Sequence, residues 1–150
     1  MSKKKFAFEK VGELKPLDYP PKILLAWGEA ISGNAKLRNW LTQNGYPELG
    51  VFVFALNNKD DARKWLIENG YAHLFALING GEGNVNAIKW LIIQGYEILA
   101  SMARFIDREQ EGLDWLLQND HKIFAFLAQK MRIVKDKIDE GNYDPHRIHF

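Results

Sequence analysis

Apolar residues recur along the chain with the spacing of short helices separated by turns. From Leu49 to Leu56 they fall at positions i, i+3, i+4 and i+7, on one face of a helix. Asn58 then has the character of an N-cap for a second helix, whose apolar stripe includes Trp65. Gly70 ends that stripe, because glycine adopts the left-handed C-terminal conformation without strain. The pattern predicts units of two short helices.

These units repeat every 25 residues. A fixed period of this size is typical of stacked supersecondary units, which bury their apolar faces against their neighbours. We therefore expect the tryptophans to pack in equivalent environments, although ligand-stacking platforms are an alternative. The columns in phase are tryptophan at Trp40, Trp65, Trp90 and Trp115, a leucine after each, and a ring at Tyr46, Tyr71, Tyr96 and His121.

The repeat predicts an all-α fold, an α-solenoid of four to five stacked helical hairpins. We expect an N-terminal arm over 1–21, a helical-repeat domain over 22–140 and a tail over 141–150. Phe6, Phe8 and Val11 suggest an extended arm, and prolines prevent a helix before Lys22. The predicted helices cover 22–31, 35–44, 47–56, 60–69, 72–79, 85–94, 97–106, 109–118 and 122–140, the last as a cap with a polar outer face.

One stretch resembles a known family. The run from Asn84 to Tyr96 is similar to the second helix of an ankyrin repeat, and Asp60 to Tyr71 is similar to it in the same way. The resemblance covers residues 22–128. The Thr-Pro-Leu-His signature is replaced by residues 71–74, and the shorter period leaves no room for the ankyrin β-hairpin loops. The resemblance implies a role in binding other proteins.

The amino-acid composition excludes several kinds of binding site and partner. The 150 residues fit one domain, and 20 basic against 19 acidic residues give a net charge of +1. This balance provides no bulk attraction to nucleic acid. The absence of cysteine excludes disulfides and thiolate metal sites. No apolar run is long enough to span a bilayer, and no export signal follows the basic N-terminus, so we expect a cytoplasmic protein without a membrane partner.

Three local clusters have a simple structural interpretation. The glycine-rich stretch 79–84 resembles a phosphate loop, but no Lys-Ser or Lys-Thr follows it and Glu82 would repel phosphate, so a flexible connection is expected. The acidic groups of 107–114 suit a helix start, with acid–base chemistry or cation binding as alternatives. His146 and His149 could share a metal, but a solvated tail is preferred.

Binding is expected at positions that differ between the repeats, since recurring positions are committed to packing. The column Glu48, His73, Ile98 and Ile123 is polar in two copies and apolar in two, and we expect it to be exposed. The predicted binding residues are Tyr71, His73, Glu82, Tyr96 and Arg108.

These residues predict a non-enzymatic module that binds a protein or peptide, with no catalytic residue, metal or cofactor. Two alternatives stay open. One is a small-ligand-binding protein or enzyme with a pocket between the tyrosine turns and the N-terminal segment. The other is a nucleic-acid binder that uses Lys3, Lys4 and Lys5.

Overall fold

The computed structural model describes residues 11–143, with side chains to Gly141. The described part is all-helical and contains no strand, as the sequence predicts. None of its helices has the length and apolar character needed to cross a membrane. The helices are α1 (Pro21–Ile31), α2 (Ala35–Gln43), α3 (Pro47–Leu56), α4 (Asp60–Glu68), α5 (Ala72–Gly81), α6 (Val85–Ile93), α7 (Glu97–Ile106), α8 (Gln110–Gln118) and α9 (Lys122–Tyr143).

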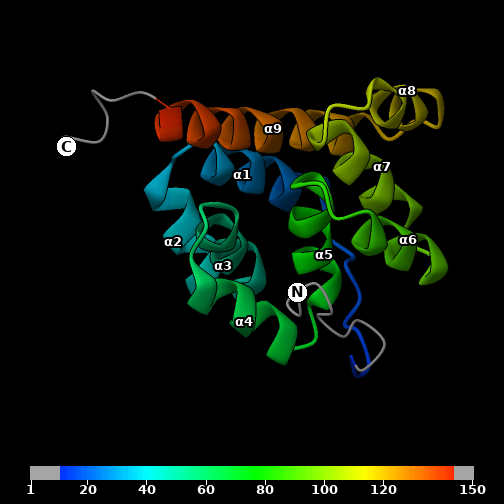
Figure 1. The fold of residues 1–150 in the computed structure, drawn as a ribbon. Helices are drawn as coiled ribbons and strands as arrows, with labels where there is room; N and C mark the ends of the chain where they lie inside the picture. Colours follow the sequence, from blue (N-terminus) through cyan, green and yellow to red (C-terminus); the bar gives the residue numbers. More distant parts are fainter. Residues whose placement is uncertain (1–10, 144–150) are drawn as a thin grey trace.

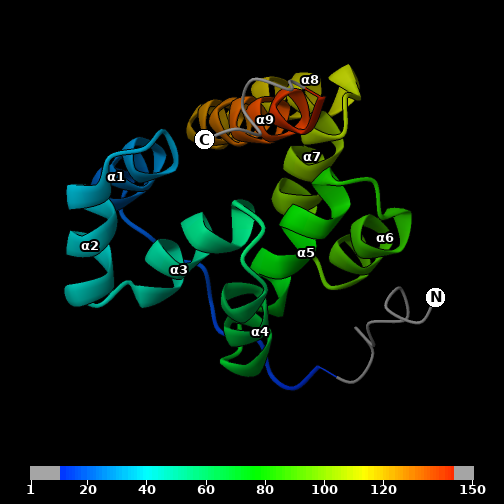
Figure 2. The same ribbon diagram turned by 60° about the vertical axis from the view of Figure 1, so that its left-hand side comes forward.

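The odd-numbered helices form an inner layer and the even-numbered helices an outer one (Figures 1 and 2). In α3 and α5 most residues are buried, whereas α2 and α4 each bury a single leucine, Leu41 and Leu66. A helix covered on several sides must be apolar around its circumference, and a helix covered on one side needs only a stripe. This explains the alternation of apolar and polar helices along the sequence.

Every short connection contains one residue with positive φ, which turns the chain back at the end of a helix. The residues with this conformation are Gly33, Asn58, Gly83 and Arg108 after the odd-numbered helices, and Gly45, Gly70, Gly95 and Asp120 after the even-numbered ones. Asn58 is therefore a turn residue with φ of 69°, and Lys59 occupies the N-cap of α4. The prediction of Asn58 as the N-cap is wrong by one position.

The glycine-rich stretch is partly helical and tightly packed, not a flexible connection. α5 continues through Gly81, two residues beyond its predicted end. A Cβ on Gly80 would lie 2.8 Å from Ile88 and one on Gly81 would lie 2.6 Å from Ile106. These glycines therefore allow α5 to approach α6 and α7 closely.

The tryptophan column does not lie in one environment. Trp40 is 44% exposed, whereas Trp65, Trp90 and Trp115 are half-buried. Trp27, outside the column, is the tryptophan of the core, 2% exposed and 5.0 Å from the ring of Phe52. The column lies on the outer helices, where only one side of a ring is covered. The expectation of equivalent environments is therefore wrong.

The long helix α9 connects the two ends of the helical array. It packs against α7 and α8, its neighbours in sequence, and also against α1. In Figure 1 it runs alongside α1 across the top of the molecule. Lys130 of α9 donates a hydrogen bond to Ser32 at the end of α1, over 2.9 Å. Its inner face is buried at Met131 and Lys135, so α9 is more than a polar cap.

Candidate functional site

The five predicted binding residues lie at two opposite ends of the inner helices. Tyr71 and Tyr96 are the N-caps of α5 and α7, and His73 lies in the first turn of α5. Glu82 and Arg108 follow the C-terminal ends of the same two helices. The structure therefore separates the predicted set into two sites.

At the first end, residues of the N-terminal arm lie against the starts of α3 and α5. The backbone N–H of Lys15 donates to the carbonyl oxygen of Gly70 over 2.9 Å. The carbonyl oxygen of Lys15 accepts from Nε2 of His73 over 2.8 Å. Both backbone groups of one arm residue are thus bound by the helical domain, and Figure 2 shows the arm, in blue, passing α3 and α4.

Side chains of the arm add to this backbone pairing. The hydroxyl of Tyr19 donates to Oε2 of Glu48 over 2.6 Å. The ring of Tyr19 meets that of Tyr46 edge-on at 6.0 Å, and the Lys15 ammonium lies 5.7 Å from the centre of the Tyr71 ring. Burial, followed by the Glu48 hydrogen bond and charge, raises the pKa of Tyr19, so its hydroxyl remains a donor.

The imidazole of His73 is completely buried. Because Nε2 faces a carbonyl oxygen, this nitrogen carries the proton and Nδ1 is the unprotonated one. Nδ1 has no hydrogen-bond partner in residues 11–143, the described part of the chain. Burial lowers the pKa of His73 to about 4, and the hydrogen bond to Lys15 opposes this only in part. The ring is therefore neutral at physiological pH.

Aromatic rings continue along this end of the molecule. Tyr71 stacks between Trp65 and His73, at 6.2 Å from each, and Tyr96 lies 4.7 Å from His73. Burial, then the Glu48 carboxylate, raises the pKa of Tyr71, and burial raises that of Tyr96. We call this surface the ring-lined edge and define it by Tyr46, Glu48, Tyr71, His73 and Tyr96.

The ring-lined edge explains the irregular column noted in the sequence. Its two polar members, Glu48 and His73, are the residues that hold the arm. The expectation that they are exposed is wrong: Glu48 is 5% exposed and His73 0%. Ile98 and Ile123, the apolar members, are half-buried. A buried polar residue needs a hydrogen-bond partner, and here the arm provides it.

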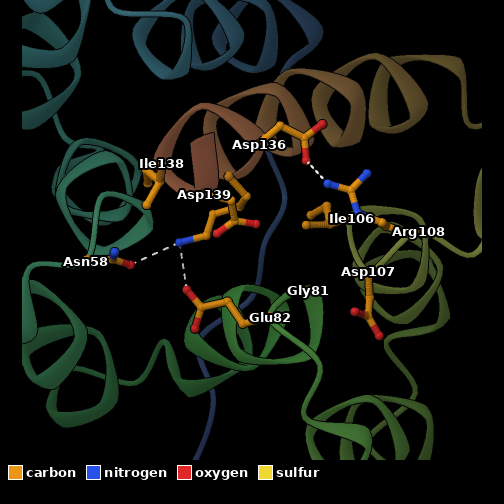
Figure 3. Close-up of a pocket in the computed structure, with 10 residues that line it drawn as sticks. Asn58, Gly81, Glu82, Ile106, Asp107, Arg108, Asp136, Ile138 and Asp139 are labelled. Carbon is orange, nitrogen blue, oxygen red and sulfur yellow. Dashed lines mark hydrogen bonds and ion pairs between the residues drawn. The ribbon is translucent and has the colours of Figure 1, made fainter. Parts of the chain in front are cut away.

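At the opposite end a cavity of about 370 Å³ lies between α9 and the C-terminal ends of α5 and α7 (Figure 3). Glu82 and Arg108 both line it, together with Asp107, Lys135 and Asp139. The dashed lines in Figure 3 mark how its polar groups bind one another. This polar cavity lies where the C-terminal ends of α3, α5 and α7 meet the long helix α9.

Lys135 is the central cation of the polar cavity. Its ammonium donates to Oε2 of Glu82 at 2.7 Å, and to the Leu56 carbonyl and Oδ1 of Asn58 at 3.0 Å each. Three donors with three acceptors satisfy a buried ammonium completely. Arg63 also binds Glu82 with both terminal nitrogens, over 2.7 and 3.1 Å. Lys135 therefore fastens α9 to the turn after α3 and to the end of α5.

The carboxylates around the polar cavity differ in their surroundings. Burial acts to raise the pKa of Glu82, but the hydrogen bonds from Arg63 and Lys135 outweigh it and lower that pKa. Burial, then repulsion from Glu109, raises the pKa of Asp107. Arg108, with φ of 71°, binds Asp136 of α9. The acids and bases here largely neutralise each other in structural ion pairs.

The acidic cluster of 107–114 is divided between different partners. Glu109, at the N-cap of α8, accepts from Arg104 over 2.9 Å, and Asp114 accepts from Gln110. No group of three or more His, Cys, Asp or Glu side chains in the described residues could hold a metal ion. His146, His149 and Lys3–Lys5 lie outside the described residues, so the hypotheses about them remain predictions.

Sequence reasoning missed the residues that complete both sites. Lys15 and Tyr19 bind residues 58 and 29 positions away, and Lys135 binds one 79 positions away. One signal was present: Tyr19 belongs to a stretch whose prolines favour an extended chain, the conformation that pairs through backbone groups.

Comparison with known proteins yields no relative. No protein-family model, curated protein or solved structure matches this chain.

Proposed function

We propose that this chain is a non-enzymatic binding module, a short α-solenoid of stacked helical hairpins that holds an extended peptide segment along its ring-lined edge. The observation that carries the proposal is the capture of Lys15 by both of its backbone groups, by Gly70 and His73. A surface that binds main-chain N–H and C=O groups accepts an extended segment, and side-chain contacts then select its sequence.

The contacts of the arm support an inference about the sequence that the edge would select. A basic residue lies over the Tyr71 ring, and a tyrosine four positions later donates to Glu48. We propose that a partner protein presents a similar extended segment, with a basic residue followed by a tyrosine. The arm of the chain then occupies the edge in the absence of the partner and competes with it.

A peptide supplied in trans tests this proposal. The probe is a fluorescent synthetic peptide with the sequence of residues 11–20. In the full chain, Lys15→Pro with Tyr19→Phe removes the N–H and O–H donors of the arm and should leave the edge open. We expect this variant to bind the peptide about tenfold more tightly than wild type, whose edge is largely occupied.

The matched control is Glu13→Pro, because the N–H of Glu13 makes no backbone hydrogen bond to the described residues. It should bind the peptide as weakly as wild type. Adding Glu48→Gln to the open variant should remove most of the gain, because the tyrosine of the peptide loses its charged acceptor. Equal binding by wild type and open variant, or binding by neither, would contradict the proposal.

A further inference from the structure

A second hollow, distinct from the ring-lined edge and from the polar cavity, also lies against α9. Its volume is about 670 Å³, within the range of small-molecule sites. It is enclosed by the end of α1, the start of α2, the end of α3 and the last turns of α9. We call it the cationic cleft.

The charges of the cleft have one sign. Arg38, Lys59 and Lys137 line it, and none of the described acidic residues does. The ammonium groups of Lys59 and Lys137 form no ion pair or hydrogen bond with the described residues. The polar cavity beyond α9, by contrast, pairs its cations with carboxylates. Three cations brought together without counter-charge repel one another, which an anion in the cleft would relieve.

Arg38 is the best-placed of these cations. Its guanidinium lies 4.5 Å from the centre of the Phe54 ring, which fixes its position. Its Nε is buried and has no hydrogen-bond partner among the described residues. Within the part of the chain that the structure describes, its one side-chain hydrogen bond goes from Nη2 to Asn39, at 3.4 Å. A guanidinium fixed in this way, with N–H groups that make no hydrogen bond to the described residues, can donate hydrogen bonds to the oxygen atoms of a phosphate.

The nearby helix ends do not already use these cations. The carbonyls at a helix C-terminus attract positive charge, and α3 ends at this cleft. However, the carbonyls of Val53 and Phe54 accept from backbone N–H groups of Asn57 and Lys59, and that of Leu56 accepts from Lys135. Capping of α3 therefore leaves the charges of Arg38 and Lys137 available.

Apolar side chains form much of the remaining wall, beside Ser32 and Asn57. Ile31 and Val53 are buried at its base, Phe54 is 41% exposed, and Val134 and Ile138 face it from α9. A ligand that uses the whole cleft needs both an anionic group and an apolar body. From the geometry we infer that the cationic cleft binds a small organic phosphate whose apolar portion packs between α3 and α9.

Phenyl phosphate is the probe, added to the isotopically labelled full chain and followed by backbone amide shifts in NMR spectra. Gly33 and Asn57, which line the cleft, should shift in a saturable manner. Inorganic phosphate has the anionic group but no apolar body, and benzyl alcohol has an apolar ring but no charge. Each should bind at least about tenfold more weakly, because the apolar or the charged contacts are absent.

Three substitutions locate the binding. Arg38→Gln and Lys137→Gln should each weaken phenyl phosphate about fivefold, the effect of one accessible charge pair. Lys89→Gln makes the same charge change on α6, away from the cleft, and should have no effect. An equal effect of Lys89→Gln, inorganic phosphate binding as tightly as phenyl phosphate, or unmoved amides at Gly33 and Asn57 would each overturn the inference.

Discussion

The buried ring of His73 makes the stability of this protein depend on pH. In the unfolded chain its pKa is 6.5, and burial lowers it to about 4 in the folded chain. Between these values the unfolded chain carries a proton on His73 that the folded chain does not. The free energy of unfolding therefore falls as the pH is lowered from 6.5 to 4, and above pH 6.5 this contribution is constant.

The size of the effect follows from the two pKa values. Each unit of difference corresponds to 1.36 kcal/mol, so about 3 kcal/mol is lost once the pH is below 4, and about 2 kcal/mol of this is lost between pH 7 and pH 5. The structural reason is the position of Nδ1. Protonation would place a charged N–H in the core at an atom that has no acceptor.

Urea denaturation of wild type and His73→Gln at pH 7, 6 and 5 measures this contribution. Subtracting the two curves cancels the other titrating groups, and the difference in unfolding free energy should change by about 2 kcal/mol. Tyr19→Phe is the control, because it weakens the arm but keeps His73; it should lower stability at every pH with the slope of wild type. Parallel curves for wild type and His73→Gln would refute the argument.

Three further substitutions test the packing, each by chemical denaturation. Lys135→Met should lower the unfolding free energy by about 3 kcal/mol, because Glu82 and two other acceptors lose a buried partner; a change below about 0.5 kcal/mol, the size of an ordinary surface effect, would contradict this role. Gly112→Ala should cost about 3 kcal/mol, since its Cβ would lie 2.2 Å from the Ser101 carbonyl oxygen, whereas Gly12→Ala meets no atom within 4 Å and should be neutral. Trp27→Ala should cost about 3–5 kcal/mol, as for a buried aromatic, and Trp40→Ala clearly less; equal costs would show that exposure does not govern them.

The helices were predictable because their signals are local. Apolar spacing and glycine stops lie within ten residues of each boundary, and α3 and α7 have the predicted bounds. The turn residues after the odd-numbered helices do not stand out in the sequence, because Asn58 and Arg108 take the place of glycine in two of the four. A positive φ is difficult to predict from the sequence when a residue other than glycine adopts it.

The candidate sites were predictable only in part, because they depend on contacts between distant segments. The tyrosines of the ring-lined edge recur in phase, and Tyr71 and Tyr96 enter the predicted binding set as neighbours of the irregular positions. The role of His73 could not be predicted, because it depends on a contact with Lys15 that forms only in the folded chain. Glu82 was selected as a loop residue, yet it is held by Arg63 from α4 and Lys135 from α9. Charge patterns along a sequence do not show such pairs.

The contact between α9 and α1 limits how helical pairs can be added to this molecule or lost from it. A stack of helical pairs with free ends can gain or lose a pair, because each pair contacts only its neighbours. Here Lys130 reaches Ser32 across 98 positions, and Lys135 reaches Leu56 across 79. An added pair would move α9 away from both acceptors. The number of helices is thus fixed by geometry, and contacts so distant in sequence favour cooperative folding of the array, at a slower rate than an open stack.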